Sequence, residues 1–209
     1  MLRDWKLPPV SIELKEGAKP YHGRPYSIPK VHKATLMKEI DRLIAIGVLK
    51  WQLLSKWASP SFIILKKDHT VHTNFRELNK CIVRKPYPIP KISTTLQELE
   101  GLTYATTLDL NMGYYTIRLD PTVAKMCTVT FPWGKYPYQR LPMGFAGSAD
   151  IFQAEMGNLI ATLEYIRVYI DDLLFITKSS HDDHLDKLEQ VFIGLRDAGL
   201  KVNAAKLVF

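Results

Sequence analysis

Two adjacent aspartates interrupt a strongly apolar stretch near residue 170. Val168, Tyr169 and Ile170 precede Asp171 and Asp172, and Leu173 to Thr177 follow them. Both flanks have the composition of β-strands, so the two carboxylates are predicted at the tip of a hairpin. Burying carboxylates beside apolar strands costs free energy unless a positive charge offsets theirs. A divalent metal ion can supply that charge, because hard divalent cations prefer oxygen ligands. A metal site is therefore one interpretation, and a solvated acidic turn is the other.

A third carboxylate, Asp109, lies at the end of another apolar stretch, Tyr104 to Leu110. If this strand pairs beside the hairpin, Asp109 and Asp171 come within reach of each other. Carboxylates that converge on a sheet can hold two Mg²⁺ ions roughly 4 Å apart. Such a pair activates an attacking hydroxyl and stabilises a leaving phosphate. Taken alone, an aspartate at this position is more often an ordinary turn residue at a strand end.

Composition excludes several classes of protein. The 209 residues suffice for one or two domains, and 46% hydrophobic with 23% charged residues is ordinary for a globular protein. The N-terminus has no apolar signal core and no apolar run could span a bilayer, so we expect neither secretion nor a membrane partner. Cys81 and Cys127 form no ligand pattern and suit a reducing compartment.

The net charge of +7 is unevenly distributed. Residues 1–100 carry 18 Lys and Arg against 9 Asp and Glu, whereas residues 101–209 carry 10 against 12. This distribution suggests a polyanionic substrate that binds to the N-terminal half and reacts in the C-terminal half. The other interpretation is a generic solvated basic surface. The extended stretch Arg84 to Lys91 contains three prolines and could lie along a nucleic-acid backbone or act as a linker.

The elements that must position these residues indicate an α+β fold with mostly antiparallel strands. Apolar periodicity and stop signals predict helices over residues 31–46, 76–80, 95–100, 147–163 and 180–198. A turn or single helical turn is expected over 120–125. Strands are expected over residues 10–14, 48–51, 61–67, 71–75, 104–110, 114–119, 126–131, 136–140 and 168–177 (interrupted by the aspartates), with another beginning at 207.

Eight segments occur in an order and spacing that resemble the reverse transcriptases of gypsy-type long-terminal-repeat retrotransposons and, more distantly, of retroviruses. They cover nearly the whole chain. The segments are Ala18 to Tyr26, Phe75-Arg-Glu-Leu-Asn-Lys80, Arg84 to Ile92, Leu108-Asp-Leu-Asn-Met-Gly-Tyr-Tyr115, Leu141-Pro-Met-Gly-Phe145, Ile151-Phe-Gln153, Tyr169-Ile-Asp-Asp172 and Ala198-Gly-Leu-Lys-Val-Asn203.

The resemblance implies a right-hand polymerase with an α+β fingers-palm core. Fingers would comprise residues 1–83 and 117–147, and palm residues 84–116 and 148–209. The thumb would be absent and the palm incomplete at its C-terminal end. The resemblance also implies origin in a larger polyprotein.

The resemblance further implies RNA-directed DNA polymerisation, in which a primer 3′ hydroxyl attacks a deoxynucleoside triphosphate on an RNA or DNA template. Two Mg²⁺ ions, with Mn²⁺ as a substitute, would bind Asp109 and Asp171, assisted by Asp172 and the Leu110 backbone. The expected nucleotide-binding residues are Lys66, His72, Tyr114 and Met143, with Tyr114 under the sugar. The expected template-primer residues are Arg76, Asn79, Gly144 and Tyr169.

The chain departs from the family pattern at the fingers hairpin. His69 replaces a turn glycine, His72 stands where an arginine is expected, and Asn74 replaces an aspartate. Two residues are missing before Asn74, and Ala149 stands where a proline is common. Two functions are therefore compatible with the sequence: an active polymerase core, or a decayed or co-opted fragment that binds nucleic acid without useful turnover.

Overall fold

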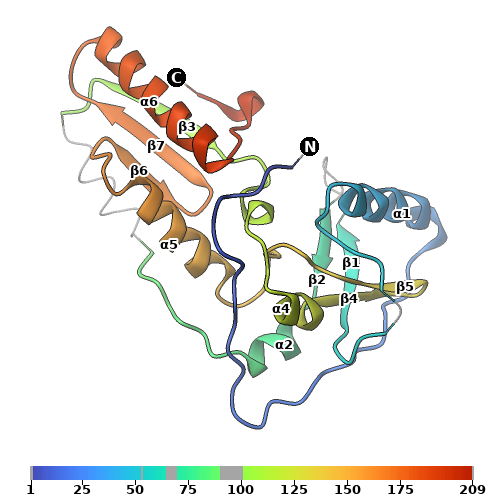
Figure 1. Ribbon diagram of the computed structural model, residues 1–209. Coiled ribbons are helices and arrows are strands. Elements are labelled where there is room, and N and C mark those ends of the chain that lie inside the picture. Colours follow the sequence, from blue (N-terminus) through green and yellow to red (C-terminus); the bar gives the residue numbers. More distant parts are fainter. Residues whose placement is uncertain (1, 53, 65–69, 90–100, 209) are drawn as a thin grey trace. The chain divides into compact units, whose positions relative to one another are not determined.

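The chain forms two compact units in a computed structural model, which describes residues 2–52, 54–64, 70–89 and 101–208. Unit 1 comprises Met1–Leu2, Leu7–Arg84 and Tyr114–Ser148. Unit 2 comprises Arg3–Lys6, Lys85–Gly113 and Ala149–Phe209. Each unit contains its own sheet, so each is described separately (Figure 1).

Unit 1 is built on a four-stranded sheet in the order β2-β1-β4-β5. Strand β1 (Ser59–Ile64) runs antiparallel to β2 (Thr70–Thr73) and parallel to β4 (Thr128–Phe131). Strand β4 continues antiparallel into β5 (Gly134–Pro137). All four residues of β4 are buried, which suits a central strand of β-branched and aromatic residues.

The described part of unit 1 also contains three α-helices. Helix α1 (Lys30–Ala45) buries Leu36, Ile40 and Leu43, which recur at helical spacing, and it ends before Gly47 at a φ of +74°. Helix α2 (Arg76–Cys81) is short. Helix α4 (Pro121–Met126) begins with proline, and the Asp120 carboxylate accepts a hydrogen bond from Thr122 N at 2.8 Å.

Unit 2 is built on a three-stranded antiparallel sheet in the order β3-β7-β6. The strands are β3 (Tyr104–Asp109), β6 (Ile166–Tyr169) and β7 (Asp172–Thr177). Single bridges from Val202 to Leu110 and from Val208 to Thr107 extend this sheet beyond β3. The short 3₁₀ helix η2 (Ala204–Lys206) lies between those two bridges in sequence.

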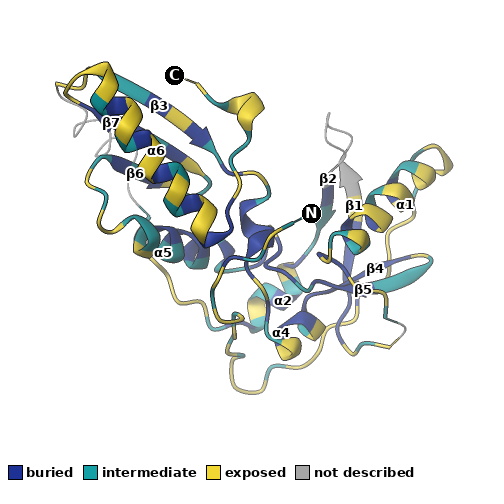
Figure 2. Cartoon of the chain, turned by 45° about the horizontal axis from the view of Figure 1, so that its top comes forward, coloured by how far each residue is buried: buried dark blue, intermediate teal, exposed yellow. Residues whose placement is uncertain are grey.

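Helices α5 (Ser148–Ile160) and α6 (His181–Ala198) pack with this sheet (Figure 1). The Ser180 hydroxyl caps α6 by accepting from Asp183 N, and Gly199 ends it at a φ of +89°. The buried residues of α6 follow one face, with exposed residues opposite (Figure 2). None of the helices in the described ranges is long and apolar enough to cross a membrane.

Two residues of unit 2, His184 and Trp5, are buried and held by side-chain contacts. The His184 imidazole is 4% exposed, and its two nitrogens lie 2.9 Å from Thr106 Oγ1 and 2.7 Å from Thr177 Oγ1. His184 is therefore a hydrogen-bonded core residue. Trp5 is 5% exposed and packs edge-on against Phe152, with ring centroids 5.8 Å apart. This contact joins residues 3–6 to unit 2.

Two predicted strands are wrong. Residues 114–119 form no strand: η1 (Gly113–Thr116) is a 3₁₀ helix, after which Ile117 N donates to the Tyr114 carbonyl at 3.2 Å, and Arg118 and Leu119 form only isolated bridges. Residues 10–14 form only isolated bridges, at Val10 and Leu14. The predicted helix over 95–100 and the end of the strand over 61–67 lie outside the described residues.

The remaining elements occur as predicted, with ends shifted by a few residues, and the α+β class is confirmed. The predicted strands over 48–51 and from 207 are represented by bridges rather than full strands, since Leu49 pairs with Tyr138 and Val208 with Thr107. Among the named strands of the described ranges, only β1 and β4 pair in parallel, and the isolated bridges Val10–Leu119 and His22–Ala58 are parallel too.

Candidate active site

The β6–β7 hairpin carries Asp171 and Asp172 at its tip. Tyr169 pairs with Asp172, so Ile170 and Asp171 form a two-residue loop. Ile170 has a φ of +59°, which suits such a loop but is unfavourable for a β-branched residue. The hairpin tip therefore needs support from neighbouring groups.

Gln153 of α5 supplies this support. Its side chain is 4% exposed, and its Oε1 accepts a hydrogen bond of 2.7 Å from Ile170 N. Its Nε2 donates to the Val168 carbonyl at 3.1 Å. One buried amide thus satisfies two backbone groups of the strand and the loop that lead to Asp171. Gln153 belongs to the Ile151-Phe-Gln153 segment of the family pattern, but no role was predicted for it from the sequence.

Pairing of β3 with β7 brings Asp109 to the same place. Asp109 is the register partner of Asp172, and Leu110 N donates to the Asp171 carbonyl at 3.1 Å. Burial raises the pKa of the Asp172 carboxyl, and the negative charges of Asp171 and Asp109 raise it further, whereas Lys206 lowers it. The three carboxylates therefore interact electrostatically at one end of the sheet.

The segment after α6 holds the Asp109 carboxylate. Lys206 Nζ lies 2.9 Å from Asp109 Oδ2, and Asn203 Nδ2 donates to Asp109 Oδ1 at 3.4 Å. Asn203 N also donates to the Asp109 carbonyl at 2.8 Å, and the Asn203 side chain caps η2 by accepting from Ala205 N. The hydrogen bond and charge of Asp109 raise the pKa of Lys206. No role was predicted for Lys206, because its contact with Asp109 joins residues 97 positions apart in the chain.

The donor chemistry of this end fits a hard divalent cation, since three carboxylates and the Leu110 backbone can all offer oxygen atoms. No group of three or more His, Cys, Asp or Glu side chains is arranged to hold a metal ion within the ranges that the structure describes. Both oxygens of Asp109 instead contact Lys206 and Asn203. Lys206 therefore supplies a positive charge that a bound cation would have to replace.

Close packing fixes the backbone after Asp109. Gly113 faces Phe152, and a Cβ at residue 113 would lie 2.8 Å from Phe152 Cζ. Phe152 is fully buried and contacts Trp5 on another side. Glycine is needed at 113 because of this approach, which links α5 and residues 3–6 to the loop that carries Asp109.

Unit 1 contains most of the other predicted site residues. Asn79 and Gly144 are brought together: Asn79 Nδ2 donates to the Gly144 carbonyl at 3.0 Å, while Asn79 Oδ1 accepts from Ala146 N at 2.8 Å. Gly144 has a φ of +81°, which favours glycine there. Met143 beside it is 48% exposed, and Arg76 is exposed at the start of α2.

His72 belongs to a row of aromatic side chains that was not predicted from the sequence. Its ring stacks on Phe62 at 6.0 Å, and Phe62 contacts Tyr26 edge-on at 6.1 Å. Tyr26 Oη accepts a hydrogen bond from Asn74 Nδ2 at 2.9 Å. Tyr26 and Phe62 are 40% and 42% exposed, so this row presents aromatic surface to solvent. Cross-strand pairing of Phe62 with His72 creates it.

Three predicted residues remain to be located. Tyr114 lies in η1 and is 9% exposed, so it is mostly a buried residue of unit 1. Tyr169 ends β6 in unit 2, where it is 41% exposed next to the hairpin loop. Lys66 lies outside the described residues.

Comparison with known proteins gives a consistent assignment. Residues 64–209 match the family described as reverse transcriptase (RNA-dependent DNA polymerase). The chain is 28% identical over 199 residues to the retrovirus-related Pol polyprotein from transposon 297 of Drosophila melanogaster, covering 91% of the chain and 19% of that protein. It is also 28% identical over 181 residues to that from transposon gypsy of the same species, covering 82% and 17%.

A solved structure is similar over the whole chain. It is a foamy viral protease-reverse transcriptase in complex with an RNA/DNA hybrid, 27% identical with a TM-score of 0.88, of which 28% is covered. The chain thus spans about a fifth of the length of the Drosophila polyproteins and under a third of this viral protein. The fold, the order of the segments and the family match agree, and the chain belongs to the reverse transcriptase (RNA-directed DNA polymerase) family.

Proposed function

We propose that this chain is the fingers-palm core of an RNA-directed DNA polymerase that works by two-metal nucleotidyl transfer. The observation that carries the proposal is the pairing of Asp109 with Asp172 across β3 and β7, next to Asp171. Unit 2 corresponds to palm and unit 1 to fingers in this proposal. As the relatives named above are polyproteins, we also propose that the chain derives from a larger one.

In the proposed reaction, the primer 3′ hydroxyl attacks the α-phosphate of a deoxynucleoside triphosphate. A new phosphorus–oxygen bond forms as the bond to pyrophosphate breaks. Asp109, Asp171 and Asp172 would hold divalent ions, which supply activation of the hydroxyl and stabilisation of negative charge when bound. Gln153 keeps the Asp171 loop in its left-handed conformation, and Asn203 orients the Asp109 carboxylate.

Template-primer recognition is proposed for residues on both units. Asn79 and Gly144 form one hydrogen-bonded group near Arg76, and Tyr169 lies beside the carboxylates. The exposed row of Tyr26, Phe62 and His72 offers faces on which bases could stack, a contact worth about 1–3 kcal/mol per base. The complex of the foamy viral relative with an RNA/DNA hybrid supports RNA and DNA as template and primer.

The incoming nucleotide is assigned to a second set of residues. Tyr114 is proposed to lie under the deoxyribose and to exclude a 2′ hydroxyl, with Met143 lining the pocket. Lys66 and His72 are proposed to contact the triphosphate. His72 also stacks on Phe62, so its ring is already partly engaged by an aromatic neighbour.

Primer extension on an RNA template with Mg²⁺ or Mn²⁺ tests this function. The wild-type chain should extend the primer, and Asp171→Asn should not, because one carboxylate ligand is lost. Asp182→Asn, which alters an exposed aspartate of α6, is the matched control and should extend normally. Extension by wild type no greater than by Asp171→Asn would refute the proposal for this chain.

The second candidate function is nucleic-acid binding without useful turnover. The ion pair of Lys206 with Asp109 favours it, since this pair already neutralises one carboxylate without a metal ion. Salt-dependent binding of primer-template by a chain that extends no primer would support this alternative.

A further inference from the structure

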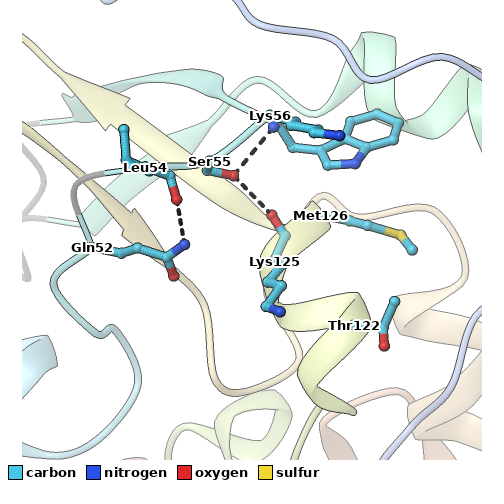
Figure 3. A pocket seen from close by; sticks show the side chains of 8 residues that line it. Gln52, Leu54, Ser55, Lys56, Thr122, Lys125 and Met126 are labelled. Carbon is cyan, nitrogen blue, oxygen red and sulfur yellow. Dashed lines mark hydrogen bonds between the residues drawn. The ribbon is translucent and has the colours of Figure 1, made fainter.

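A pocket in unit 1 has no role in the reaction described above. It has a volume of about 380 Å³ and lies between residues 52 and 54–57 on one side and helix α4 on the other (Figure 3). Its walls include Gln52, Ser55, Lys56 and Trp57 from the first side, and Lys125 and Met126 from the helix. Pockets that hold small ligands start at about 300 Å³, so one nucleotide-sized group fits.

The wall of this pocket is held in place by hydrogen bonds around Ser55. Its Oγ accepts from Trp57 N at 3.2 Å and lies 3.1 Å from Thr128 Oγ1. Thr128 Oγ1 in turn donates to the Lys125 carbonyl at 2.7 Å, which joins Ser55 to the end of α4. Gln52 N donates to the Lys135 carbonyl at 3.0 Å and fixes Gln52 to β5. The pocket is therefore preformed.

The charged side chains that line the pocket are lysines. Lys56 and Lys125 line it, and a third lysine, Lys135, donates from Nζ to the Ser55 carbonyl at 3.4 Å. Among the described residues that line the pocket, none is acidic. The nearby Asp120 carboxylate accepts from Thr122 N at the start of α4. A ligand with negative charge is therefore favoured.

The rest of the lining is apolar. Trp57, which is 8% exposed, and Met126 contribute a ring and a thioether to the lining beside the lysines, and Leu54 is 83% exposed at the pocket. A phosphate next to a flat base satisfies both the cationic and the apolar parts. An acidic peptide would use the lysines but offers no flat group for the apolar wall.

We propose that this pocket is a second binding site for single-stranded nucleic acid, in which Lys56 and Lys125 contact phosphates and the wall of Trp57 and Met126 receives a base. The choice of ligand rests on the proposed polymerase function, in which single-stranded template must be held. The evidence for the pocket itself comes only from residues of unit 1.

Fluorescence anisotropy with a labelled single-stranded oligonucleotide tests the proposal. Lys56→Glu/Lys125→Glu should weaken binding at least tenfold. The slope of log affinity against log salt should fall by about 1.4, because each phosphate contact on a single strand contributes about 0.7. Lys30→Glu/Lys38→Glu, on exposed positions of α1 in the same unit, makes the same change in net charge and should have a smaller effect on both.

A third variant separates charge from the apolar wall. Met126→Ala should weaken binding several-fold and leave the salt slope unchanged. Equal losses in the two double-lysine variants would overturn the proposal and indicate a generic basic surface. Displacement of the oligonucleotide by poly-glutamate at equal charge concentration would also overturn it, in favour of an acidic peptide ligand.

Failure of this proposal is distinguishable from failure of the polymerase function. With a saturating primer-template, Lys56→Glu/Lys125→Glu should retain the wild-type rate of primer extension. A salt-sensitive binding defect with normal extension supports the site. Normal binding by this variant in a chain that extends primers would refute the site and leave the polymerase proposal intact.

Discussion

Replacing Gln153 with leucine tests how the hairpin loop is held. Leucine has nearly the same size but can neither donate to the Val168 carbonyl nor accept from Ile170 N. Each lost hydrogen bond should cost about 1 kcal/mol, and leaving a buried backbone group unsatisfied adds about 1 kcal/mol. We therefore expect the free energy of unfolding to fall by about 2–3 kcal/mol, as measured by urea denaturation.

The same variant should affect catalysis more than binding. Ile170 has a φ of +59° and loses its only described side-chain acceptor, so the Asp171 loop should leave its left-handed conformation more often. We expect kcat for primer extension to fall about tenfold or more, since a loss of 1.4 kcal/mol already corresponds to a factor of ten. KM for primer-template should stay close to that of wild type.

A matched control is available in the same unit. Gln190 is exposed on α6, and its Oε1 accepts from Tyr165 Oη at 3.2 Å. Gln190→Leu should change the free energy of unfolding by less than about 0.5 kcal/mol and leave kcat unchanged. If Gln153→Leu were as stable and as active as Gln190→Leu, the argument that Gln153 positions the metal-binding hairpin would be refuted.

Three further predictions concern other contacts of unit 2. Gly113→Ala should lower the free energy of unfolding by about 1–3 kcal/mol, because the added methyl group would meet the Phe152 ring. Phe152→Leu should relieve this clash, so additive costs of the two substitutions in a double-mutant cycle would contradict the prediction. Burial and the charge of His181 lower the pKa of His184, so the unfolded chain binds its proton more tightly. Stability should therefore be full above about pH 6.5 and fall as pH drops below it, by up to about 1.4 kcal/mol per unit in urea titrations. His184→Gln should lose this component, whereas His181→Gln should lose only the smaller part that the charge of His181 causes, because burial is the larger cause. Lys206→Met should tighten Mn²⁺ binding about two- to fivefold by calorimetry, because a competing cation is removed, while Lys201→Met on the same segment should have little effect.

The carboxylate end of unit 2 could be predicted from the sequence because it depends on local signals. Asp171 and Asp172 stand between two strand-like stretches, and Asp109 ends a third, so pairing of those strands was sufficient to bring them together. The resemblance to reverse transcriptases then selected Asp109, which its own environment does not distinguish.

The supporting contacts could not be predicted in the same way. Gln153, Lys206 and Trp5 act through packing between residues far apart in the chain, and no periodicity specifies such contacts. Residues 114–117 were misassigned because strand-like composition describes how side chains fit a sheet, whereas this backbone forms a local 3₁₀ turn in which Ile117 N donates to the Tyr114 carbonyl. The aromatic row at His72 depends on the register of β1 with β2, which composition alone does not fix.

The most direct test of the central claim is the number of divalent ions bound by the three aspartates. Electron paramagnetic resonance should count Mn²⁺ on the chain in complex with a dideoxy-terminated primer-template and a deoxynucleoside triphosphate. We predict two tightly bound ions for wild type and for Asp182→Asn, and fewer for Asp109→Asn and Asp171→Asn. Equal Mn²⁺ binding by all four proteins would contradict the assignment of these carboxylates as the metal site of a polymerase.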